Sequence, residues 1–324
     1  MNNGRNALLV CLFAMLACSL QSCKKDMLHY QNVQRLESNT TDRLNDILFI
    51  NDSTGFVVGG ERFLSTTMLV THDGGYTWEP RSFPEAGKEL FGISQSPEGN
   101  LYSCGYDGKM LYSTDGGEHW TFKQQEGYLP NKKIVFPQEG KGIMVGGISF
   151  EVGYLSHVNG SCDVGSWDSV SYEINDIKMV NSHTGYMCGY GVVLRTDDGG
   201  DTWQILNIKG DNFTSISIYN TDIWVCGYNG SVFHTGDGGS TWQKQRNGND
   251  VSQVSYHLSA ILFKDAMNGW TVGEKGAVLH SDDGGKHWSP YDNFTPSDLQ
   301  SLAFGPNGDI IVAGNGGALY RVKP

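Results

Sequence analysis

The alternation of apolar and polar residues predicts short β-strands along most of this chain. One such strand recurs seven times, at intervals of roughly 40–45 residues. A period of two puts the apolar side chains of a strand on one face, so these strands have one buried face. The first apolar positions of the seven copies are Ile47, Ile93, Ile134, Ile177, Ile216, Ile261 and Leu302.

A second apolar strand follows each copy and ends in glycine. Its last two residues are Val58-Gly59, Cys104-Gly105, Val145-Gly146, Cys188-Gly189, Cys226-Gly227, Val272-Gly273 and Ala313-Gly314. A unit of this length holds four short strands, as one blade of a β-propeller does. We therefore expect an all-β fold, a seven-bladed β-propeller over residues 44–324.

An eight-residue motif lies after the third strand of five units. The copies are THDGGYTW (71–78), STDGGEHW (113–120), TDDGGDTW (196–203), TGDGGSTW (235–242) and SDDGGKHW (281–288). We expect the aspartate to accept turn N–H groups, the glycines to adopt positive φ, and the tryptophan to pack the turn against the blade. The aspartates are Asp73, Asp115, Asp198, Asp237 and Asp283, and the tryptophans are Trp78, Trp120, Trp203, Trp242 and Trp288.

Calcium is the alternative role for these motifs, because two of them carry paired aspartates, as at Asp197-Asp198. A hard cation takes six or more oxygen ligands, which one pair in a turn does not supply. We therefore expect a structural role, no metal and no cofactor. The third unit lacks the motif and has SHVNGSCDVGSW in its place.

The seventh unit ends after its third strand, ALYRV, and needs a fourth strand from elsewhere. The segment HYQNVQRL (29–36) precedes the first unit and fits no other position. We expect it to close the ring as the outer strand of blade 7, which would leave no open sheet edge.

The N-terminal residues predict export and lipid attachment. Residues 1–22 combine Arg5 with an apolar run, which is typical of a signal peptide and too short for a spanning helix. Leu20-Gln21-Ser22-Cys23 resembles a bacterial lipobox, with Cys23 as the lipidated residue and Cys18 as a weaker candidate. Residues 23–43 would form a short tether and the closing strand. We expect an extracytoplasmic, lipid-anchored protein of a bacterial membrane, on the periplasmic or surface face of the outer membrane.

Composition narrows the function. The formal net charge is −12, and no basic stripe is present, so nucleic acid is not an expected partner. Glycine makes up 43 of 324 residues, well above the ordinary share of about 7% and in keeping with many turns. Cys104, Cys188 and Cys226 share one repeat position, where we expect small buried side chains too far apart for disulfides. We expect a monomer.

The five motifs resemble the Asp-box, or BNR repeat, of sialidases and many other propellers. Two longer stretches, GYMCGYGVVLRTDDGGDTW (185–203) and GWTVGEKGAVLHSDDGGKHW (269–288), resemble blades of the photosystem II assembly and stability factor propellers. This resemblance covers residues 44–324, with blades 3 and 7 lacking the Asp-box. It implies a binding scaffold whose functional face lies opposite the Asp-boxes. It does not carry over the photosystem partner.

The implied functional face holds the turns between second and third strands and the links between blades. A tyrosine follows the glycine column in blades 2, 4 and 5, and exposed aromatics beside an arginine form a plausible protein-binding patch. The alternative is that the tyrosine rings brace neighbouring blades. The candidate binding residues are Arg62, Tyr106, Tyr190, Tyr228, Tyr256 and Glu274.

A sialidase-like or other glycan-active enzyme is the alternative function. Residues 23–324 contain seven arginines, and no arginine motif of the sialidase kind precedes the first Asp-box. The sequence also lacks GxSxG, HExxH and P-loop motifs. We therefore expect a non-catalytic protein that binds a protein partner or a glycan, a role compatible with an assembly or scaffold factor. A concave site with two carboxyl groups about 5–9 Å apart would favour the enzyme.

Overall fold

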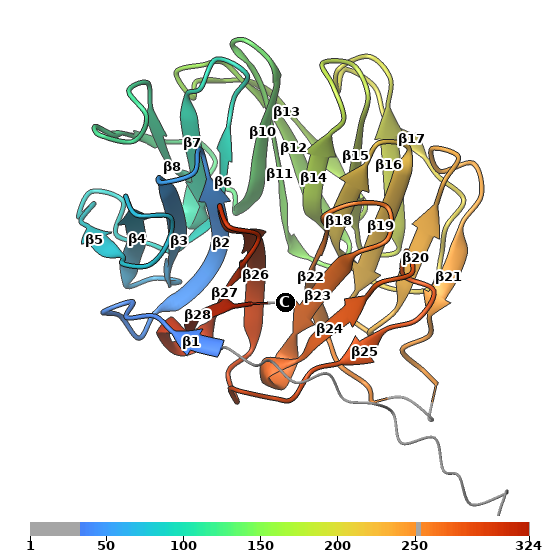
Figure 1. Ribbon diagram of the computed structural model, residues 1–324. Coiled ribbons are helices and arrows are strands. Elements are labelled where there is room, and N and C mark those ends of the chain that lie inside the picture. Colours follow the sequence, from blue (N-terminus) through green and yellow to red (C-terminus); the bar gives the residue numbers. More distant parts are fainter. Residues whose placement is uncertain (1–32, 251–253, 324) are drawn as a thin grey trace, which may run out of the picture.

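Seven antiparallel sheets surround a central channel in the computed structural model (Figure 1). The structure describes residues 33–250 and 254–323. Within these ranges every sheet has four strands, and the first strands of neighbouring blades contact one another around the channel. This is the seven-bladed propeller that the repeat predicted. No helix among the described residues is long and apolar enough to cross a bilayer.

The strands follow one another outward from the channel in each blade. Blade 1 contains β2 (Arg43–Phe49), β3 (Gly55–Glu61), β4 (Ser65–Thr71) and β5 (Glu79–Arg81). Blade 2 contains β6 (Leu90–Gln95), β7 (Leu101–Gly105), β8 (Lys109–Ser113) and β9 (Thr121–Gln124). Blade 3 contains β10 (Asn131–Gln138), β11 (Lys141–Ser149), β12 (Val152–Val158) and β13 (Val164–Val170). Blade 4 contains β14 (Ile174–Met179), β15 (Gly185–Gly189), β16 (Val192–Thr196) and β17 (Gln204–Ile205).

The remaining blades keep the same order. Blade 5 contains β18 (Phe213–Tyr219), β19 (Asp222–Gly227), β20 (Val232–Thr235) and β21 (Gln243–Arg246). Blade 6 contains β22 (Leu258–Phe263), β23 (Gly269–Gly273), β24 (Val278–Ser281) and β25 (Ser289–Pro290). Blade 7 contains β26 (Leu299–Phe304), β27 (Ile310–Gly314), β28 (Leu319–Val322) and, from the other end of the chain, β1 (Val33–Arg35).

The closing strand predicted from residues 29–36 is present. β1 pairs antiparallel with β28, Val33 opposite Val322 and Arg35 opposite Tyr320, and the two lie side by side in Figure 1. The Leu36 amide extends the ladder by donating to the Leu319 carbonyl at 2.9 Å. Residues 29–32 lie outside the described residues. The pairing gives β28 a partner on its outer edge, so blade 7 presents no bare third strand.

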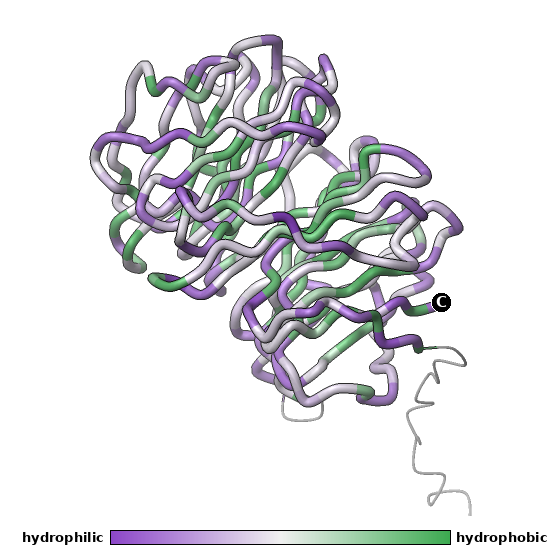
Figure 2. Tube along the Cα trace, turned by 90° about the vertical axis from the view of Figure 1, so that its left-hand side faces the viewer, coloured by the Kyte–Doolittle hydropathy of each residue, from purple (hydrophilic) through white to green (hydrophobic). Residues whose placement is uncertain are grey.

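The apolar core is divided among the blade boundaries. Each of seven buried clusters combines side chains of two neighbouring blades, and Leu36 and Leu44 belong to the one that joins blade 7 to blade 1. Figure 2 shows the apolar segments along the strands and the hydrophilic ones mainly at the turns. Every boundary therefore depends on the packing of two blades, and the ring is stable only as a whole.

The Asp-box turns form the bonds expected of them. In blade 1, Asp73 Oδ1 accepts from the backbone N–H groups of Tyr76 and Thr77, both at 2.9 Å. The Thr71 hydroxyl donates to Asp73 Oδ1 at 2.8 Å and accepts from the Gly75 N–H at 2.8 Å. The Trp78 indole donates to the Gly75 carbonyl at 3.2 Å. The motif thus satisfies most of its own donors, and the Gly74 N–H donates to the Ser53 carbonyl of the neighbouring turn at 2.8 Å.

The position before each Asp-box tryptophan is chemically restricted, although it varies in sequence. Thr77 Oγ1 donates to Asp73 Oδ2 at 2.7 Å, and Thr202 and Thr241 repeat the contact in their boxes. His119 and His287 place Nδ1 at 2.7 and 2.6 Å from the second aspartate oxygen of their boxes. Threonine and histidine share one property here, a polar side-chain atom two or three bonds from Cα that reaches the carboxylate.

The Asp-boxes also join neighbouring blades. The tryptophans Trp78, Trp120, Trp203, Trp242 and Trp288 each pack into the cluster shared with the preceding blade, a wider role than bracing their own turns. The Gly238 carbonyl of the blade 5 box accepts from the Tyr186 hydroxyl and from Arg195 of blade 4, at 3.2 and 3.0 Å. Blade 3 keeps this contact without an Asp-box, since the Gly160 carbonyl accepts from the Tyr102 hydroxyl at 3.0 Å.

Acid should weaken the Asp-box turns. The Thr241 hydroxyl and amide hold the pKa of Asp237 at about 2, below its ordinary value of 3.8, and the His119 amide and ring do the same for Asp115. Because the folded-state pKa is lowered, the stabilisation is complete above about pH 4 and is lost as the pH falls toward 2. We expect the melting temperature to drop steeply over that range.

A melting series from pH 6 to pH 2 checks this expectation. Asp237→Asn should be less stable at pH 6 and should show a smaller further loss in acid than the wild type. Asp201→Asn is the matched control, because Asp201 is an exposed residue of the blade 4 box outside its hydrogen-bond set. If Asp237→Asn and wild type lost the same stability between pH 4 and pH 2, the turn would not account for the acid sensitivity.

Candidate protein-binding face

The two ends of the propeller are built from different turns. Because neighbouring strands are antiparallel, the turns between first and second strands lie at the same end as the Asp-boxes. We call this end the Asp-box face. The turns between second and third strands and the links between blades lie at the other end, which we call the opposite face.

Most turns of the opposite face are short, but two hairpins project from it. In blades 2, 6 and 7 the turn is a single 3₁₀ turn whose middle residue has positive φ: Asp107 at 61°, Lys275 at 54° and Gly316 at 69°. In blades 1 and 3 the strand pairing continues past the glycine column, to Glu61 opposite Ser65 and to Ser149 opposite Val152. These two hairpins therefore rise beside the short turn of blade 2.

A cavity of about 980 Å³ occupies the central channel and opens at the opposite face. Its wall carries one β-bulge per blade, since the register shifts once near the start of every first strand. The residues inserted at the bulges all line the cavity and are Asn45, Phe91, Lys132, Asn175, Thr214, Ser259 and Gln300. A bulge turns an extra side chain out of the ladder, which here means toward the channel.

Several bulge residues bond to the next blade. The Asn45 amide donates to the Leu90 carbonyl at 2.7 Å, and Asn175 donates to the Phe213 carbonyl at 2.8 Å. The Thr214 hydroxyl donates to the Leu258 carbonyl at 2.8 Å. These bonds satisfy first-strand carbonyls that face the channel, so the bulges fix the inner rim of the propeller.

Several charged side chains at the cavity have a partner of opposite charge, although Arg62 and Lys178, which also line it, form no ion pair with another described residue. Lys132 Nζ lies 2.7 Å from Glu173 Oε1, and Lys133 Nζ lies 2.6 Å from Asp46 Oδ2. The Glu274 carboxylate lies 3.3 Å from His257 Nδ1. Ion pairs of this kind lower the electrostatic potential at this part of the cavity wall, so these groups attract a charged ligand only weakly.

The predicted binding residues are distributed unevenly. Arg62, Tyr106, Tyr228 and Glu274 line the cavity, whereas Tyr190 is exposed outside its lining. Tyr256 is half-buried and packs against the cluster between blades 5 and 6.

The tyrosines at the blade boundaries form aromatic pairs. Tyr106 meets Phe63 of blade 1 at 5.0 Å, and Tyr190 stacks on Phe150 of blade 3 at 4.8 Å between ring centroids. Tyr228 stacks on His257 at 3.8 Å. Each ring therefore braces its neighbour, as the alternative interpretation held, and Tyr190 and Tyr228 also remain substantially exposed.

The bulge residues were not predicted from the sequence, although the repeat contains a pattern that could have identified them. Each lies two positions before an apolar first-strand residue of the repeat, as Asn45 precedes Ile47 and Asn175 precedes Ile177. Six of the seven are polar, the exception being Phe91. Aligning the blades on their apolar column would have shown this polar column.

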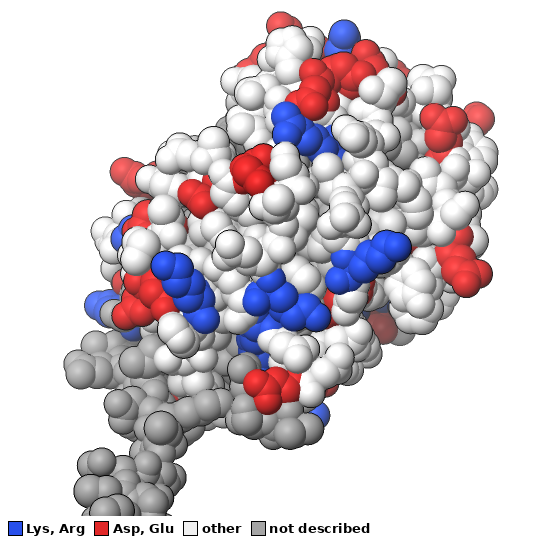
Figure 3. Space-filling view, turned by 90° about the vertical axis from the view of Figure 1, so that its right-hand side faces the viewer, with Lys and Arg blue, Asp and Glu red and all other residues white. Residues whose placement is uncertain are grey.

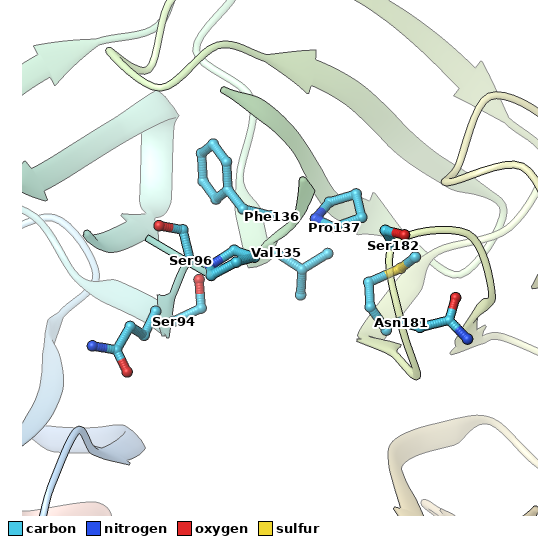
Figure 4. Close-up of a pocket in the computed structure, with 10 residues that line it drawn as sticks. Ser94, Ser96, Val135, Phe136, Pro137, Asn181 and Ser182 are labelled. Atoms are coloured by element: carbon cyan, nitrogen blue, oxygen red, sulfur yellow. The ribbon is translucent and has the colours of Figure 1, made fainter. Parts of the chain in front are cut away.

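A smaller cavity, of about 380 Å³, lies at the Asp-box face (Figure 4). Its lining comes from three blades, with Ser94 and Ser96 from blade 2, Phe136 from blade 3 and Ser182 from blade 4. The side chains in Figure 4 carry hydroxyl, amide and apolar groups but no charge. This cavity therefore lacks acid, base and cation for catalysis.

The cysteine thiols of the described residues are poorly suited to act as nucleophiles. Burial raises the pKa of the Cys162 and Cys226 thiols to about 12, and it raises that of Cys104 and Cys188 as well. All four cysteines are buried and unpaired, so a reactive thiolate is disfavoured. No cluster of three or more His, Cys, Asp or Glu side chains that could hold a metal occurs in the described ranges.

Comparison with known proteins supports the resemblance. The profile of the family described as "Photosynthesis system II assembly factor YCF48" matches residues 161–252. A Synechococcus protein named "Photosystem II assembly lipoprotein Ycf48" is 28% identical over 165 residues, 49% of this chain and 48% of the relative. The chain is a seven-bladed propeller similar to the photosystem II assembly factors.

Two further comparisons extend this result. The chloroplast stability and assembly factor HCF136 of Arabidopsis thaliana is 35% identical over 99 residues, 28% of this chain and 23% of that protein. The matched segments thus span about half, or less, of these relatives. A solved structure described as YCF48 bound to D1 peptide superposes with a TM-score of 0.70 at 21% identity, covering 92% of this chain and 99% of the other. At that identity the superposition shows the fold alone.

Proposed function

We propose that this chain is a non-catalytic, lipid-anchored propeller of the bacterial cell envelope that binds a protein partner at its opposite face. The observation that carries the proposal is the cavity of about 980 Å³ with aromatic pairs at its rim. Concave surfaces with aromatic anchors are typical of recognition sites. The similar proteins support a protein rather than a glycan as partner, since one is named an assembly lipoprotein and another is described with a bound peptide.

A glycan-active enzyme is the less favoured function. Retaining and inverting glycosidases need one carboxyl group as acid and a second as nucleophile or base. Of the carboxyl groups that line this cavity, Asp46, Glu173 and Glu274 are each engaged by a cationic or imidazole group. The Asp176 carboxylate accepts from the backbone N–H groups of Ile177 and Ile216, both at 2.9 Å. Arg43 and Arg62 are the arginines of the described ranges that line it, whereas Arg195 and Arg321 contact Asp-box turns. The arrangement suits binding better than hydrolysis.

The distribution of charge on the surface favours a protein partner over a nucleic acid. On the face shown in Figure 3, Lys and Arg side chains stand in separate groups among uncharged residues, with acidic side chains beside several of them. A nucleic-acid surface would instead need a continuous basic track.

A pull-down from native membranes tests partner binding. Alanine at Arg62, Tyr106, Tyr190 and Tyr228 together should remove the partner that the wild type retains, because these residues supply the aromatic rim. Trp167→Ala is the control, since Trp167 is an exposed aromatic residue of the outer strand of blade 3. The melting temperature of both variants is measured, because the tyrosines also brace blades. Retention of the partner by the folded fourfold variant would place the binding site elsewhere, with the link 244–257 as the next candidate.

Lipid attachment makes a separate prediction. Cys23 lies outside the described residues and ten positions before Val33, so its tether reaches at most about 35 Å. Val33 pairs with Val322 at the Asp-box end of β28, so the tether would enter at that face and keep the seam of blade 7 near the bilayer. Cys23→Ser should abolish labelling with a radioactive fatty acid and release soluble protein, whereas Cys18→Ser should do neither. Labelling that survives Cys23→Ser would move the anchor.

A further inference from the structure

The opposite face has a marked asymmetry in its exposed apolar side chains. Leu64 is 80% exposed and Ile148 is 63% exposed, and Phe63 and Phe150 beside them are also more than half exposed. All four sit on the projecting hairpins of blades 1 and 3. The corresponding turns of blades 6 and 7 are short and polar, with Glu274-Lys275 and Asn315-Gly316. Apolar groups that stand in clusters on a protein surface mark contact sites.

The two hairpins flank blade 2 and are continuous with the cavity. Phe63 lies against Tyr106, and Tyr106 in turn lies 6.3 Å from Phe91, the bulge residue of blade 2. Ile148 of blade 3 lines the same cavity as Phe91 and Tyr106. An apolar surface therefore runs from the tip of one hairpin across blade 2 to the tip of the other.

The charges beside this surface argue for an uncharged occupant. Lys88 and Asp107 form an ion pair within the short turn region of blade 2, and Lys132 is paired with Glu173. Glu61 and Glu151 at the hairpin tips are exposed and acidic, and they would repel an acidic ligand. Arg62 packs over the Tyr106 ring at 5.7 Å. The aliphatic tips, Leu64 and Ile148, offer no stacking face or hydrogen bond to a sugar.

The position of the chain outside the structure argues against a lipid occupant. That chain joins β1 at the Asp-box end of blade 7, and the hairpins project from the other end. With the anchor at Cys23, the tether holds the Asp-box end toward the bilayer and the hairpins away from it. The surface is therefore presented to molecules that approach from the aqueous side.

We infer that the partner is held off-centre, over blades 1 to 3, through an apolar, uncharged segment of its polypeptide that packs between the hairpin tips and across Tyr106. This inference rests on the proposed function and adds to it the chemical character of the segment that the partner presents. Burial of apolar area supplies the binding energy, and the exposed Glu61 and Glu151 disfavour acidic segments.

Selection from a random twelve-residue peptide library on the immobilised protein tests the inference. The selected peptides should be enriched in Leu, Ile, Phe and Trp and should carry no net acidic charge. Their affinity should fall at least tenfold for the pair Leu64→Ser and Phe150→Ser. It should stay within twofold for Ile205→Ser and Met267→Ser, which replace exposed apolar residues away from the opposite face. It should also change less than twofold between 50 and 500 mM NaCl, because apolar contacts are not screened.

Each other outcome has a definite meaning. Acidic peptides that lose affinity with salt and with Arg62→Ala would overturn the inference and leave the proposed function standing. Sedimentation of the Cys23→Ser protein with phosphatidylethanolamine–phosphatidylglycerol vesicles, lost in the hairpin variant, would make lipid the occupant. Concentration-dependent dimerisation lost in that variant would make it a second copy of this chain. A library that yields no peptide sensitive to hairpin or rim variants would contradict both the inference and the proposed function.

Discussion

Arg321→Ala is expected to lower the free energy of unfolding by about 3–5 kcal/mol, since it removes one partner of a buried ion pair. Arg321 is 1% exposed, and its Nη1 donates to Asp309 Oδ2 at 2.7 Å. Its Nη2 donates to the Gly74 carbonyl in the blade 1 Asp-box, also at 2.7 Å. The guanidinium carbon lies 3.8 Å from the centre of the Tyr76 ring. One side chain thus joins the last blade to the first.

Urea unfolding of the purified protein measures this effect. Arg321→Lys should recover only part of the loss, because an ammonium group cannot serve both acceptors and the ring with the geometry of a planar guanidinium. Arg195→Ala is the matched control, since Arg195 contacts the blade 5 Asp-box from the same repeat position but is partly exposed. Equal losses for Arg321→Ala and Arg195→Ala would mean that the blade 7 contact has no special role in closing the ring.

Removal of the closing strand is the second large effect that we expect. A protein beginning at residue 38 lacks β1 and Leu36, whereas one beginning at residue 27 keeps both. Leu36 is 3% exposed in the cluster between blades 7 and 1, and truncating such a leucine to alanine alone costs about 2–5 kcal/mol. Loss of the β1–β28 ladder also exposes a bare strand edge. We expect the shorter protein to melt at clearly lower temperature and to self-associate.

Scanning calorimetry and sedimentation velocity of the two truncated proteins provide the measurement. The protein beginning at residue 27 controls for loss of the signal peptide and anchor. Adding a synthetic peptide of residues 27–37 to the shorter protein should restore part of the melting temperature, as strand addition to an open edge does. A shorter protein with unchanged melting temperature would show that blade 7 is stable with three strands.

The number of blades and their order could be read from the sequence because they depend on local patterns. Alternation with period two identifies a strand, and the glycine column marks the end of the second strand in five blades, as at Gly273. In blades 1 and 3 the strand instead continues past the glycine, to Glu61 and Ser149. For blade 6, the predicted first-strand position Ile261 lies in β22, and the predicted pair Val272-Gly273 ends β23. The closing strand followed from counting, since blade 7 had three strands and the segment 29–36 remained unassigned.

The role of the second glycine of the Asp-box shows what only the tertiary structure decided. Sequence reasoning assigned it to backbone freedom, and Gly117 and Gly200 do have positive φ. The structure adds that a Cβ at Gly117 would clash with Phe56 of blade 1, and one at Gly200 with Ile143 of blade 3. These contacts join residues of neighbouring blades that are more than one repeat apart in the sequence, and no local pattern predicts which side chain the neighbouring blade will present.

The candidate binding face was likewise predicted in part from the sequence, and the rest of it became evident only in the structure. Period and strand order alone placed Arg62, Tyr106 and Tyr228 at one end of the blades, because those properties fix the end at which a turn lies. Their pairing with aromatic side chains of neighbouring blades, the neutralised wall of the cavity and the bulge residues appeared only in three dimensions. Each depends on how far one blade is rotated and shifted against the next. That geometry is set by the packing of whole side chains across a boundary, whereas the sequence pattern records only which face of a strand is apolar.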